Sequence, residues 1–397
     1  MRKLKYYFKG DAILWAAIFL ISLASFLPVY SASSNLQYVV GQGSVLGHFA
    51  KHAGFILVGI GIVFVFQKID YKYFGGFSKL LLPVVIFLLI LTLMQGNNID
   101  GTNASRWLKL PGVPFAFQTS VFAALVLNVY IARYLDRNKD KEMTFNNSFV
   151  PVLLPVFLVT GLIFPANGST GIMTFLMILA LLFIGGYPFK IMVSIVGVGV
   201  VIIFVFITLV LKYPDMFPSN RIHTWKSRIE NFVGDDKQES YQVQQAKAAI
   251  VQGGIIPRGP GKSAFKQSLP QSSSDFIFAI IVEEYGYGGV FICFFLYLLI
   301  LWRIIVIATK VENVFGTLLV VGVGLPVIFQ AFSNMAVAVN LIPVTGQPLP
   351  ILSYGGTSMW VAYMVLGIII SVSREIQPKE SIINTNENKE ETNYEIA

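Results

Sequence analysis

The sequence predicts an all-α integral membrane protein with about ten transmembrane helices, and three observations lead to this fold class. The chain has 397 residues, of which 55% are hydrophobic and only 13% are charged. Soluble domains carry about 25% charged residues, so the composition argues strongly against a water-soluble enzyme of this length. The mean hydropathy is +0.68, and apolar stretches long enough to cross roughly 30 Å of hydrocarbon recur along the chain.

Ten mostly apolar stretches qualify as membrane spans, because each comes close to the roughly 20 residues that a spanning helix needs. The spans are expected at about 12–30, 50–67, 78–95, 117–134, 149–165, 170–186, 189–211, 275–302, 314–338 and 353–373. The first has no small-residue cleavage site at its end and is followed by further spans. It is therefore interpreted as a retained helix and not as a signal peptide.

Lysine and arginine in the short connections set the orientation of the spans. These basic residues precede span one, follow spans two and four, and separate spans eight and nine, which puts them all on one side, expected to be the cytoplasm. They are Arg2, Lys3, Lys5, Lys9, Lys68, Lys72, Arg133, Arg137, Lys139, Lys141, Arg303 and Lys310. Both termini are then cytoplasmic. Residues 1–373 form the membrane domain, and the Asn- and Glu-rich tail 374–397 is expected to be disordered.

Four segments face outward in this topology and are candidates to carry chemistry: 96–116, 165–169, 212–274 and 339–352. The long loop 212–274, between spans seven and eight, is rich in basic residues. They are Arg221, Lys226, Arg228, Lys247, Arg258, Lys262 and Lys266. Loops of more than about 60 residues escape the positive-inside rule, so the topology stands. Basic groups on the outer face suit a lipid phosphate or pyrophosphate, and an ordinary solvated loop is the alternative.

The net charge of +8, from 29 Lys and Arg against 21 Asp and Glu, is explained by this topology. Nucleic acid is therefore not an expected partner. Cys293 is the only cysteine, so no intramolecular disulfide can form. The three histidines, His48, His52 and His223, are scattered, and no metal site is expected from them. No GxxxxGK[ST], HExxH or GxSxG motif is present in a suitable context.

Three acidic residues near the start of span eight are the sharpest candidates, because burying an ionisable group in a membrane is costly. Asp275 stands where the basic loop meets the span, and Glu283 and Glu284 follow on the same predicted helix. Asp275 and Glu283 would lie about 80° apart around the helix and about 12 Å apart along it, too far to share a proton. Helix capping is the alternative role for Asp275. Glu283 and Glu284 are expected to be structural, paired with donors on other helices.

Two further clusters are polar at membrane level. The segment from Asn340 to Ser358 reads NLIPVTGQPLPILSYGGTS, and its three prolines and Gly-Gly pair predict a non-helical re-entry that is buried or lines a wet cavity. Its Ser353 and Thr357 are candidates for contact with a substrate. The segment GTNASRWLKLPG, from Gly101, puts Arg106 and Lys109 beside Trp107 at the outer interface.

At these clusters the chain resembles the SEDS family, the polytopic peptidoglycan polymerases known as FtsW, RodA and SpoVE. The resemblance rests on AIVQGGIIPRGPGKS, KQSLPQSSSDFIFAIIVEE and NMAVAVNLIPVTGQPLPILSYGGTS, in the order and spacing of the family. It implies ten spans with a large outer loop between spans seven and eight. VYSAS at Val29, PANGST at Pro165 and VNLIPVTGQPLP look most similar to the division-type FtsW of Bacteroidetes-like bacteria.

The resemblance implies polymerisation of lipid II, with undecaprenyl pyrophosphate as the leaving group and inversion at the anomeric carbon. The critical carboxylate of the family falls on Asp275, which would be the general base. Candidates for binding the pyrophosphates are Arg221, Arg228, Arg258, Lys262 and Lys266, with Arg106 and Lys109 in support. No cofactor is implied, although assistance by a divalent cation is left open. The implied partners are a class B penicillin-binding protein, other divisome proteins, lipid II and membrane lipids, at the division septum of the bacterial inner membrane.

The chain departs from the family pattern at three positions. Val121 and Ala124 replace an acidic residue and a lysine on span four, and Ala166 replaces an acidic residue between spans five and six. Loss of both ends of a buried pair can be nearly neutral, so this change is interpreted as removal of a structural strut. The alternative functions are a lipid II flippase, a RodA-type elongation polymerase and a non-enzymatic divisome scaffold.

Overall fold

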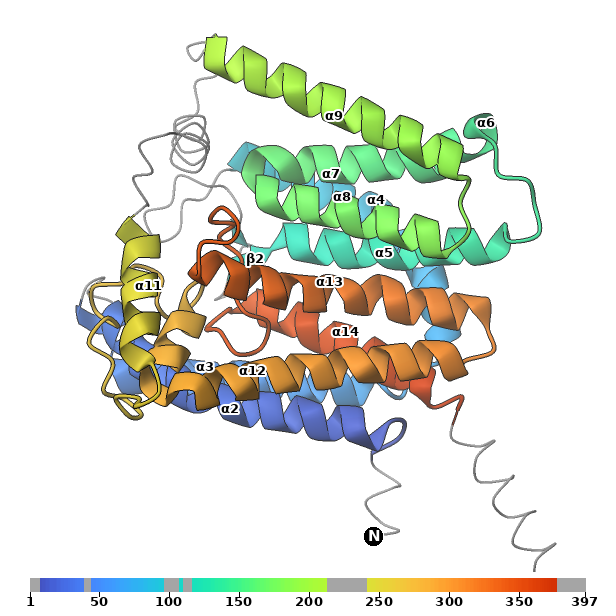
Figure 1. Cartoon of the computed structure of the whole chain (residues 1–397). Coiled ribbons are helices and arrows are strands. Elements are labelled where there is room, and N and C mark those ends of the chain that lie inside the picture. Colours follow the sequence, from blue (N-terminus) through green and yellow to red (C-terminus); the bar gives the residue numbers. More distant parts are fainter. Residues whose placement is uncertain (1–7, 39–43, 96–106, 110–115, 213–240, 377–397) are drawn as a thin grey trace, which may run out of the picture.

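The computed structural model describes residues 8–38, 44–95, 107–109, 116–212 and 241–376. Its helices run largely side by side and form one elongated bundle (Figure 1). All ten predicted spans are helical. Their bounds are α2 Ala12–Tyr38, α3 Val45–Phe66, α4 Tyr71–Gln95, α5 Thr119–Arg137, α7 Leu154–Ala166 with the π-helical turn Phe149–Leu153 before it, α8 Gly168–Ile184, α9 Phe189–Lys212, α12 Ile277–Lys310, α13 Val314–Ala338 and α14 Thr357–Ser373.

The apolar character of these helices confirms the predicted all-α membrane protein. Within the described part of the chain, six helical stretches are long and apolar enough to cross a bilayer, and three shorter apolar helices lie at 168–184, 189–201 and 357–373. The short helix α6, Phe145–Ser148, and the π-helical turn lead into α7 as one such stretch. The chain is therefore a multi-pass membrane protein.

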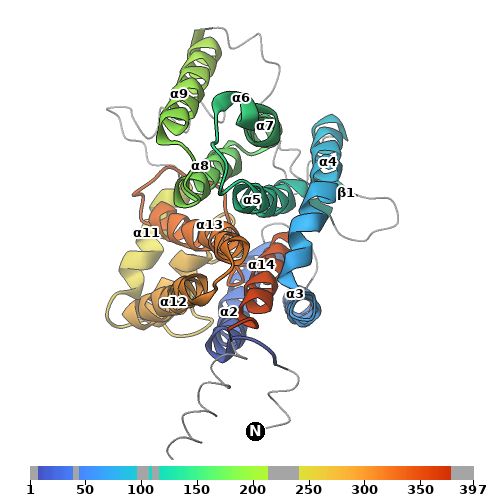
Figure 2. The ribbon, with the colours of Figure 1, turned by 90° about the vertical axis from the view of Figure 1, so that its right-hand side faces the viewer.

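The centre of the bundle is formed by α5, α13 and α14, as the view along the helices shows (Figure 2). Nearly every residue of α14 from Val361 to Ser373 is buried. A helix that is hydrophobic all round belongs in such a central position, because every face meets another helix and not water. In contrast, α9 lies at the edge of the bundle and packs mainly against α8.

One end of the bundle is fastened by an ion pair between Asp11, just before α2, and Arg303, near the end of α12. The Arg303 Nε donates to Asp11 Oδ1 at 3.0 Å, and its Nη2 pairs with Oδ2. Bidentate pairs of this kind are among the stronger charge-assisted contacts. The same Asp11 Oδ1 accepts from the backbone N–H of Leu14 at 2.7 Å and so caps the first turn of α2.

The other end carries a helix and a two-stranded sheet that were not predicted from the sequence. Helix α11, Tyr241–Gly253, lies within the predicted outer loop 212–274 and crosses the end of the bundle (Figure 1). It buries Val243, Ala246 and Ala249 on one face. Strands β1, Trp107–Lys109, and β2, Ala116–Gln118, pair antiparallel, with Leu108 opposite Phe117.

The predicted span at about 275–302 corresponds to α12, which begins at Ile277 and extends further, to Lys310. It also contains a break that was not predicted, at Gly286, whose φ of 60° and ψ of −148° are not helical. A side chain at Gly286 would meet the carbonyl oxygen of Gly254 at 2.7 Å. The break therefore depends on close packing against a segment more than 30 residues away, which local sequence pattern does not disclose.

We predict that Gly253→Ala destabilises the protein, because the added methyl group would lie 2.0 Å from the carbonyl oxygen of Val282 in α12. Overpacking against backbone costs roughly 1–3 kcal/mol, which should appear as a lower midpoint of thermal unfolding in detergent. Gly61→Ala is the matched control, since within the described part of the chain nothing lies within 4 Å of a methyl group at that position. Equal midpoints for the two variants would contradict the close packing of α11 on α12.

Candidate functional site

The segment that carries Asp275 is fixed by its backbone. Three successive carbonyl oxygens accept hydrogen bonds: that of Ser273 from the Tyr354 N–H at 2.9 Å, and that of Ser274 from the Ser353 hydroxyl at 2.7 Å. The third, of Asp275 itself, accepts from the Asn334 side-chain amide at 2.7 Å. Donors from α13 and from the connection between α13 and α14 therefore set the position of Asp275.

The connection between α13 and α14 is non-helical from 339 to 356, which confirms the predicted non-helical segment, and its re-entry into the membrane stays a prediction. Its carbonyls are satisfied from neighbouring helices: Gln347 by Asn334 at 2.8 Å, Pro348 by Gln330 at 2.8 Å and Pro350 by the Tyr297 hydroxyl at 2.5 Å. This pairing meets the requirement that irregular backbone at membrane depth be buried in protein.

Within this connection, Ile351 adopts a φ of 67°. A left-handed conformation is unusual for a β-branched residue and costs of order 1–3 kcal/mol. The surrounding hydrogen bonds maintain it. The Ser353 hydroxyl accepts from the Leu349 N–H at 2.7 Å, and the Ser353 N–H donates to the Leu349 carbonyl at 3.0 Å.

Asp275 is half-buried and lies two residues before the first residue of α12, directly before the N-cap residue Phe276. The helical spacing used to relate Asp275 to Glu283 therefore holds only from Ile277 onward. Its place beside the start of a helix exposes Asp275 to the positive end of the helix dipole, which favours a carboxylate.

Glu283 is completely buried and receives two hydrogen bonds and one ion-pair contact from the outer loop. The Ala264 N–H donates to its carboxylate at 2.7 Å, the Ser263 hydroxyl donates to its other oxygen, and the Arg258 Nε lies 3.7 Å away. A buried carboxylate is tolerated only with such compensation. The donors come from a loop, whereas the sequence led us to expect donors on other helices.

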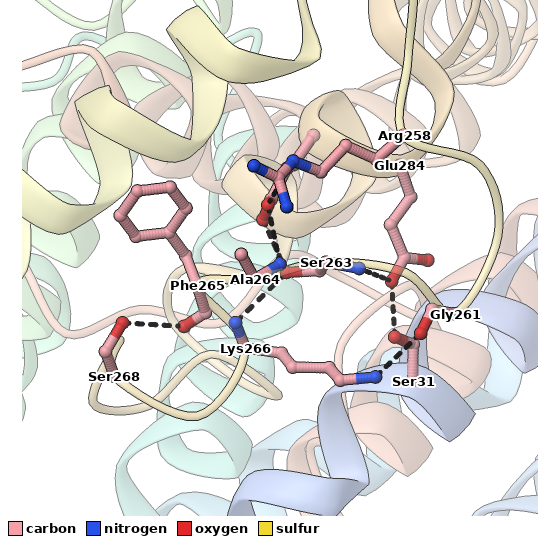
Figure 3. Close-up of polar contacts among 10 residues, drawn as sticks. Ser31, Arg258, Gly261, Ser263, Ala264, Phe265, Lys266, Ser268 and Glu284 are labelled. Atoms are coloured by element: carbon pink, nitrogen blue, oxygen red, sulfur yellow. Dashed lines mark hydrogen bonds and ion pairs between the residues drawn. The ribbon is translucent and has the colours of Figure 1, made fainter.

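Glu284 is buried beside it and joins the same loop to α2. Its Oε1 accepts from the Ser263 N–H at 3.3 Å and from the hydroxyl of Ser31. Figure 3 shows Ser31 and Ser263 converging on the Glu284 carboxylate. We refer to Glu283, Glu284, Ser263 and Ala264 as the carboxylate clamp.

Backbone hydrogen bonds at the interruption of α12 add to the side-chain bonds of the carboxylate clamp. The Arg258 N–H donates to the Glu283 carbonyl at 3.2 Å, and the Gly259 N–H donates to the Glu284 carbonyl at 3.1 Å. A helix end leaves such carbonyls without intrahelical partners, and here N–H groups of the loop donate hydrogen bonds to them. Side chains and backbone together fix residues 258–264 on α12.

The clamp presents three of the predicted basic residues on one segment. Lys262 is exposed, Lys266 Nζ donates to the Gly261 carbonyl at 2.7 Å, and Arg258 faces Glu283. The predicted residues Arg106, Arg221 and Arg228 lie outside the described residues, and for Lys109 only the backbone, in β1, is described.

Ser353 and Thr357 are both buried, and their hydroxyls bond within the protein. Ser353 bonds to Ser274 and Leu349, as described above. The Thr357 hydroxyl accepts from the Gln118 N–H at 3.1 Å and lies 3.2 Å from the Ala116 carbonyl, so it joins β2 to α14. Direct contact of either residue with a substrate stays a prediction.

A cavity of about 70 Å³ lies behind the connection between α13 and α14, which is room for several water molecules. It is lined by residues of α5, α8, α13 and α14 as well as by 347–353. Val121 and Ala124, the departures on span four, both line it. Asn128, also on its wall, has a side-chain carbonyl with no hydrogen-bond partner among the residues that the structure describes.

The residues that support Asp275 were not identified from the sequence. Gln330 and Asn334 are four apart on α13 and therefore share one face of that helix. Two amides at helical spacing in an otherwise apolar span are the signal that could have found them. Ser263 and Ser31 carry no signal by residue type, because single serines are common in loops and in membrane helices, although both lie within motifs quoted for the resemblance.

Comparison with known proteins gives a consistent result. The model of the cell cycle protein family of FtsW, RodA and SpoVE matches residues 11–377. Stage V sporulation protein E of Bacillus subtilis is 31% identical over 92% of this chain and 97% of its own length. A probable peptidoglycan glycosyltransferase FtsW of Geobacter sulfurreducens is 29% identical over 88% and 91%.

Solved structures show the same fold. A chain of a peptidoglycan synthase complex matches with a TM-score of 0.70 and 23% identity, over 93% of this chain and 98% of that chain. The rod shape determining protein RodA of Thermus thermophilus matches with a TM-score of 0.63 and 22% identity, at the same coverage.

We predict that Glu283→Ala frees the loop that the carboxylate clamp holds. Hydrogen bonds to a charged group contribute about 1.5–3 kcal/mol each, so amide hydrogen exchange in peptides covering 258–266 should accelerate at least tenfold. Glu312→Ala, at an exposed acid in another connection, is the control and should leave that exchange unchanged. Unchanged exchange in Glu283→Ala would show that the clamp does not hold the loop.

Proposed function

Because the chain belongs to the FtsW, RodA and SpoVE family of cell cycle proteins, we propose that it is an inverting glycosyltransferase that polymerises lipid II into glycan strands during cell division. The observation that carries the proposal is the fixed backbone at Ser273–Asp275. The names of the relatives support the class of activity. The division role rests on the resemblance of VYSAS, PANGST and VNLIPVTGQPLP to division-type members.

In this reaction the 4-hydroxyl oxygen of one lipid-linked disaccharide attacks the anomeric carbon of the MurNAc on a second. The bond from that carbon to the pyrophosphate oxygen breaks, its electron pair leaves with undecaprenyl pyrophosphate, and Asp275 accepts the hydroxyl proton. Inversion needs no covalent enzyme intermediate. The hydrogen bond from Asn334 and those to the adjacent serines position Asp275, because a misplaced base loses much of its effect.

The negative charge that develops on the leaving pyrophosphate needs cations fixed nearby. Lys262, Lys266 and Arg258 are suited to this role, because the carboxylate clamp fixes the segment that carries them. Arg221, Arg228, Arg106 and Lys109 complete the proposed cationic set.

The proposed partner is a class B penicillin-binding protein that crosslinks the strands as they form. A structural relative of this chain is part of a peptidoglycan synthase complex, which supports a partnership of this kind. We place the protein in the inner membrane at the division septum, with both termini in the cytoplasm. This orientation puts the end of the bundle with Asp11 and Arg303 inside and α11 outside.

We predict that Asp275→Asn lowers the rate of lipid II polymerisation by at least a hundredfold, because general base catalysis contributes about 10²- to 10⁴-fold. Purified full-length protein and its cognate transpeptidase would be given lipid II, and glycan strands would be resolved by gel electrophoresis. Asp140→Asn, an exposed acid between α5 and α6, is the matched control and should retain activity. Glycan synthesis by Asp275→Asn at the wild-type rate would refute the proposed base.

The lipid II assay tests the flippase alternative, and complementation in cells tests the scaffold and elongation alternatives. With lipid II on the outer face, a flippase has no transport to perform and yields no polymer, whereas a glycosyltransferase yields strands. A scaffold would support division in cells that carry Asp275→Asn, provided the variant is expressed and binds its partner. An elongation-type polymerase would restore elongation, and not division, to depleted cells.

A further inference from the structure

The turn that follows α11 exposes large apolar side chains at the end of the bundle. In residues 254–258, which we call the apolar turn, Ile255 and Ile256 are 84% and 88% exposed. Val251, in the last turn of α11, is exposed beside them. Clustered exposed aliphatic side chains are unfavourable in water and indicate a surface that contacts another apolar phase.

The exposure is built into the fold, because both ends of the apolar turn are bonded to α12. The Tyr287 N–H donates to the Gly254 carbonyl at 3.3 Å, and the Arg258 N–H donates to the Glu283 carbonyl at 3.2 Å. Gly253, just before the turn, packs directly against the backbone of Val282. Ile255 and Ile256 are therefore held on the outside of α12, close to its interruption.

The depth of the turn follows from the length of α12. Trp302 is half-exposed and lies under the Arg303 guanidinium at 4.8 Å. Because tryptophan and arginine are typical of membrane interfaces, we take this level as one interface. Tyr287 is 15 residues away along the uninterrupted part of the helix, which is about 22 Å. The hydrocarbon layer is about 30 Å thick, so Tyr287 and the Gly254 bonded to it fall inside its far boundary.

The apolar turn also continues a surface that must face lipid. Tyr287 and Phe291 are four residues apart on α12 and are 66% and 70% exposed, with Phe295 exposed in the next turn. This strip runs along a membrane-spanning helix and meets the apolar turn at the Tyr287–Gly254 hydrogen bond. The turn therefore extends the lipid-facing side of α12.

We propose that the apolar turn is a membrane anchor, which inserts Ile255 and Ile256 into the acyl chains of the leaflet remote from the Asp11–Arg303 end. Lys262, four residues beyond the apolar turn, is exposed. From this depth its long side chain extends to the lipid phosphates, as basic side chains do at membrane interfaces. Insertion would hold the basic segment at the headgroup plane. The proposal does not depend on the chemical reaction assigned above.

Depth-dependent fluorescence quenching tests this directly. In a Cys293→Ala background, which removes the only cysteine, Ile256→Cys would be labelled with bimane. The full chain, without any partner protein, would be placed in nanodiscs whose lipids carry doxyl groups on their acyl chains. Phe291→Cys, on the lipid-facing strip, is the positive control, and Asp140→Cys, in an exposed connection, is the negative control.

The expected result is quenching of the Ile256 label to within twofold of the Phe291 label and at least threefold more than the Asp140 label. Quenching closer to that of Asp140 would overturn the proposal, because the turn would then face water. Protection of the Ile256 label only after the cognate transpeptidase is added would also overturn it, since the patch would then be a protein interface. Loss of polymerisation by Asp275→Asn is independent of all these outcomes.

Discussion

The structure depends on one constraint: backbone and carboxylate groups at membrane depth must find their hydrogen-bond partners inside the protein. Two irregular segments, 271–276 and 339–356, meet this constraint largely through each other and through α13. Asn334 donates to the carbonyls of both Asp275 and Gln347, so a single amide joins them. The position of Asp275 is thus a consequence of satisfying the re-entrant backbone. Precision at this carboxylate comes from the rigid helices around it, although the residue itself is outside any helix.

The same constraint explains two adjacent buried carboxylates. Glu283 and Glu284 would be very costly to bury alone, and each is compensated by donors from residues 258–264. Their compensation has a mechanical consequence. Because Ser31 of α2 also donates to Glu284, one cluster joins the outer loop, the interrupted α12 and the first helix of the bundle. The basic segment is thereby held rigidly on the bundle, as the proposed binding of pyrophosphate by this segment would require.

Features with a local or periodic signal were predictable from the sequence, and features made by distant packing were not. The ten spans follow from apolar length, and the re-entry at 340–358 follows from its prolines and glycines. The interruption at Gly286 could not be predicted, because it arises from contact with Gly253 and Gly254. Helix α11 has only a short apolar face among polar residues. The same pattern occurs in loops, so the sequence did not distinguish this helix from a loop. At the site, Asp275 was a candidate because it is an acid at the start of a span, and the resemblance implied its role as the base. In contrast, Gln330 and Asn334 were hidden in an apolar span.

The departures from the family pattern can now be related to the cavity. Val121 and Ala124 line it, so the missing charged pair would have belonged to the cavity wall as much as to a strut between helices. Its joint loss leaves an apolar patch and no orphan charge, which is the tolerable way to lose such a pair. The polar residues that hold the re-entrant loop, Gln330 and Asn334, are on α13 and remain. The change on α5 therefore alters what the cavity can hold, while the support of Asp275 is independent of it.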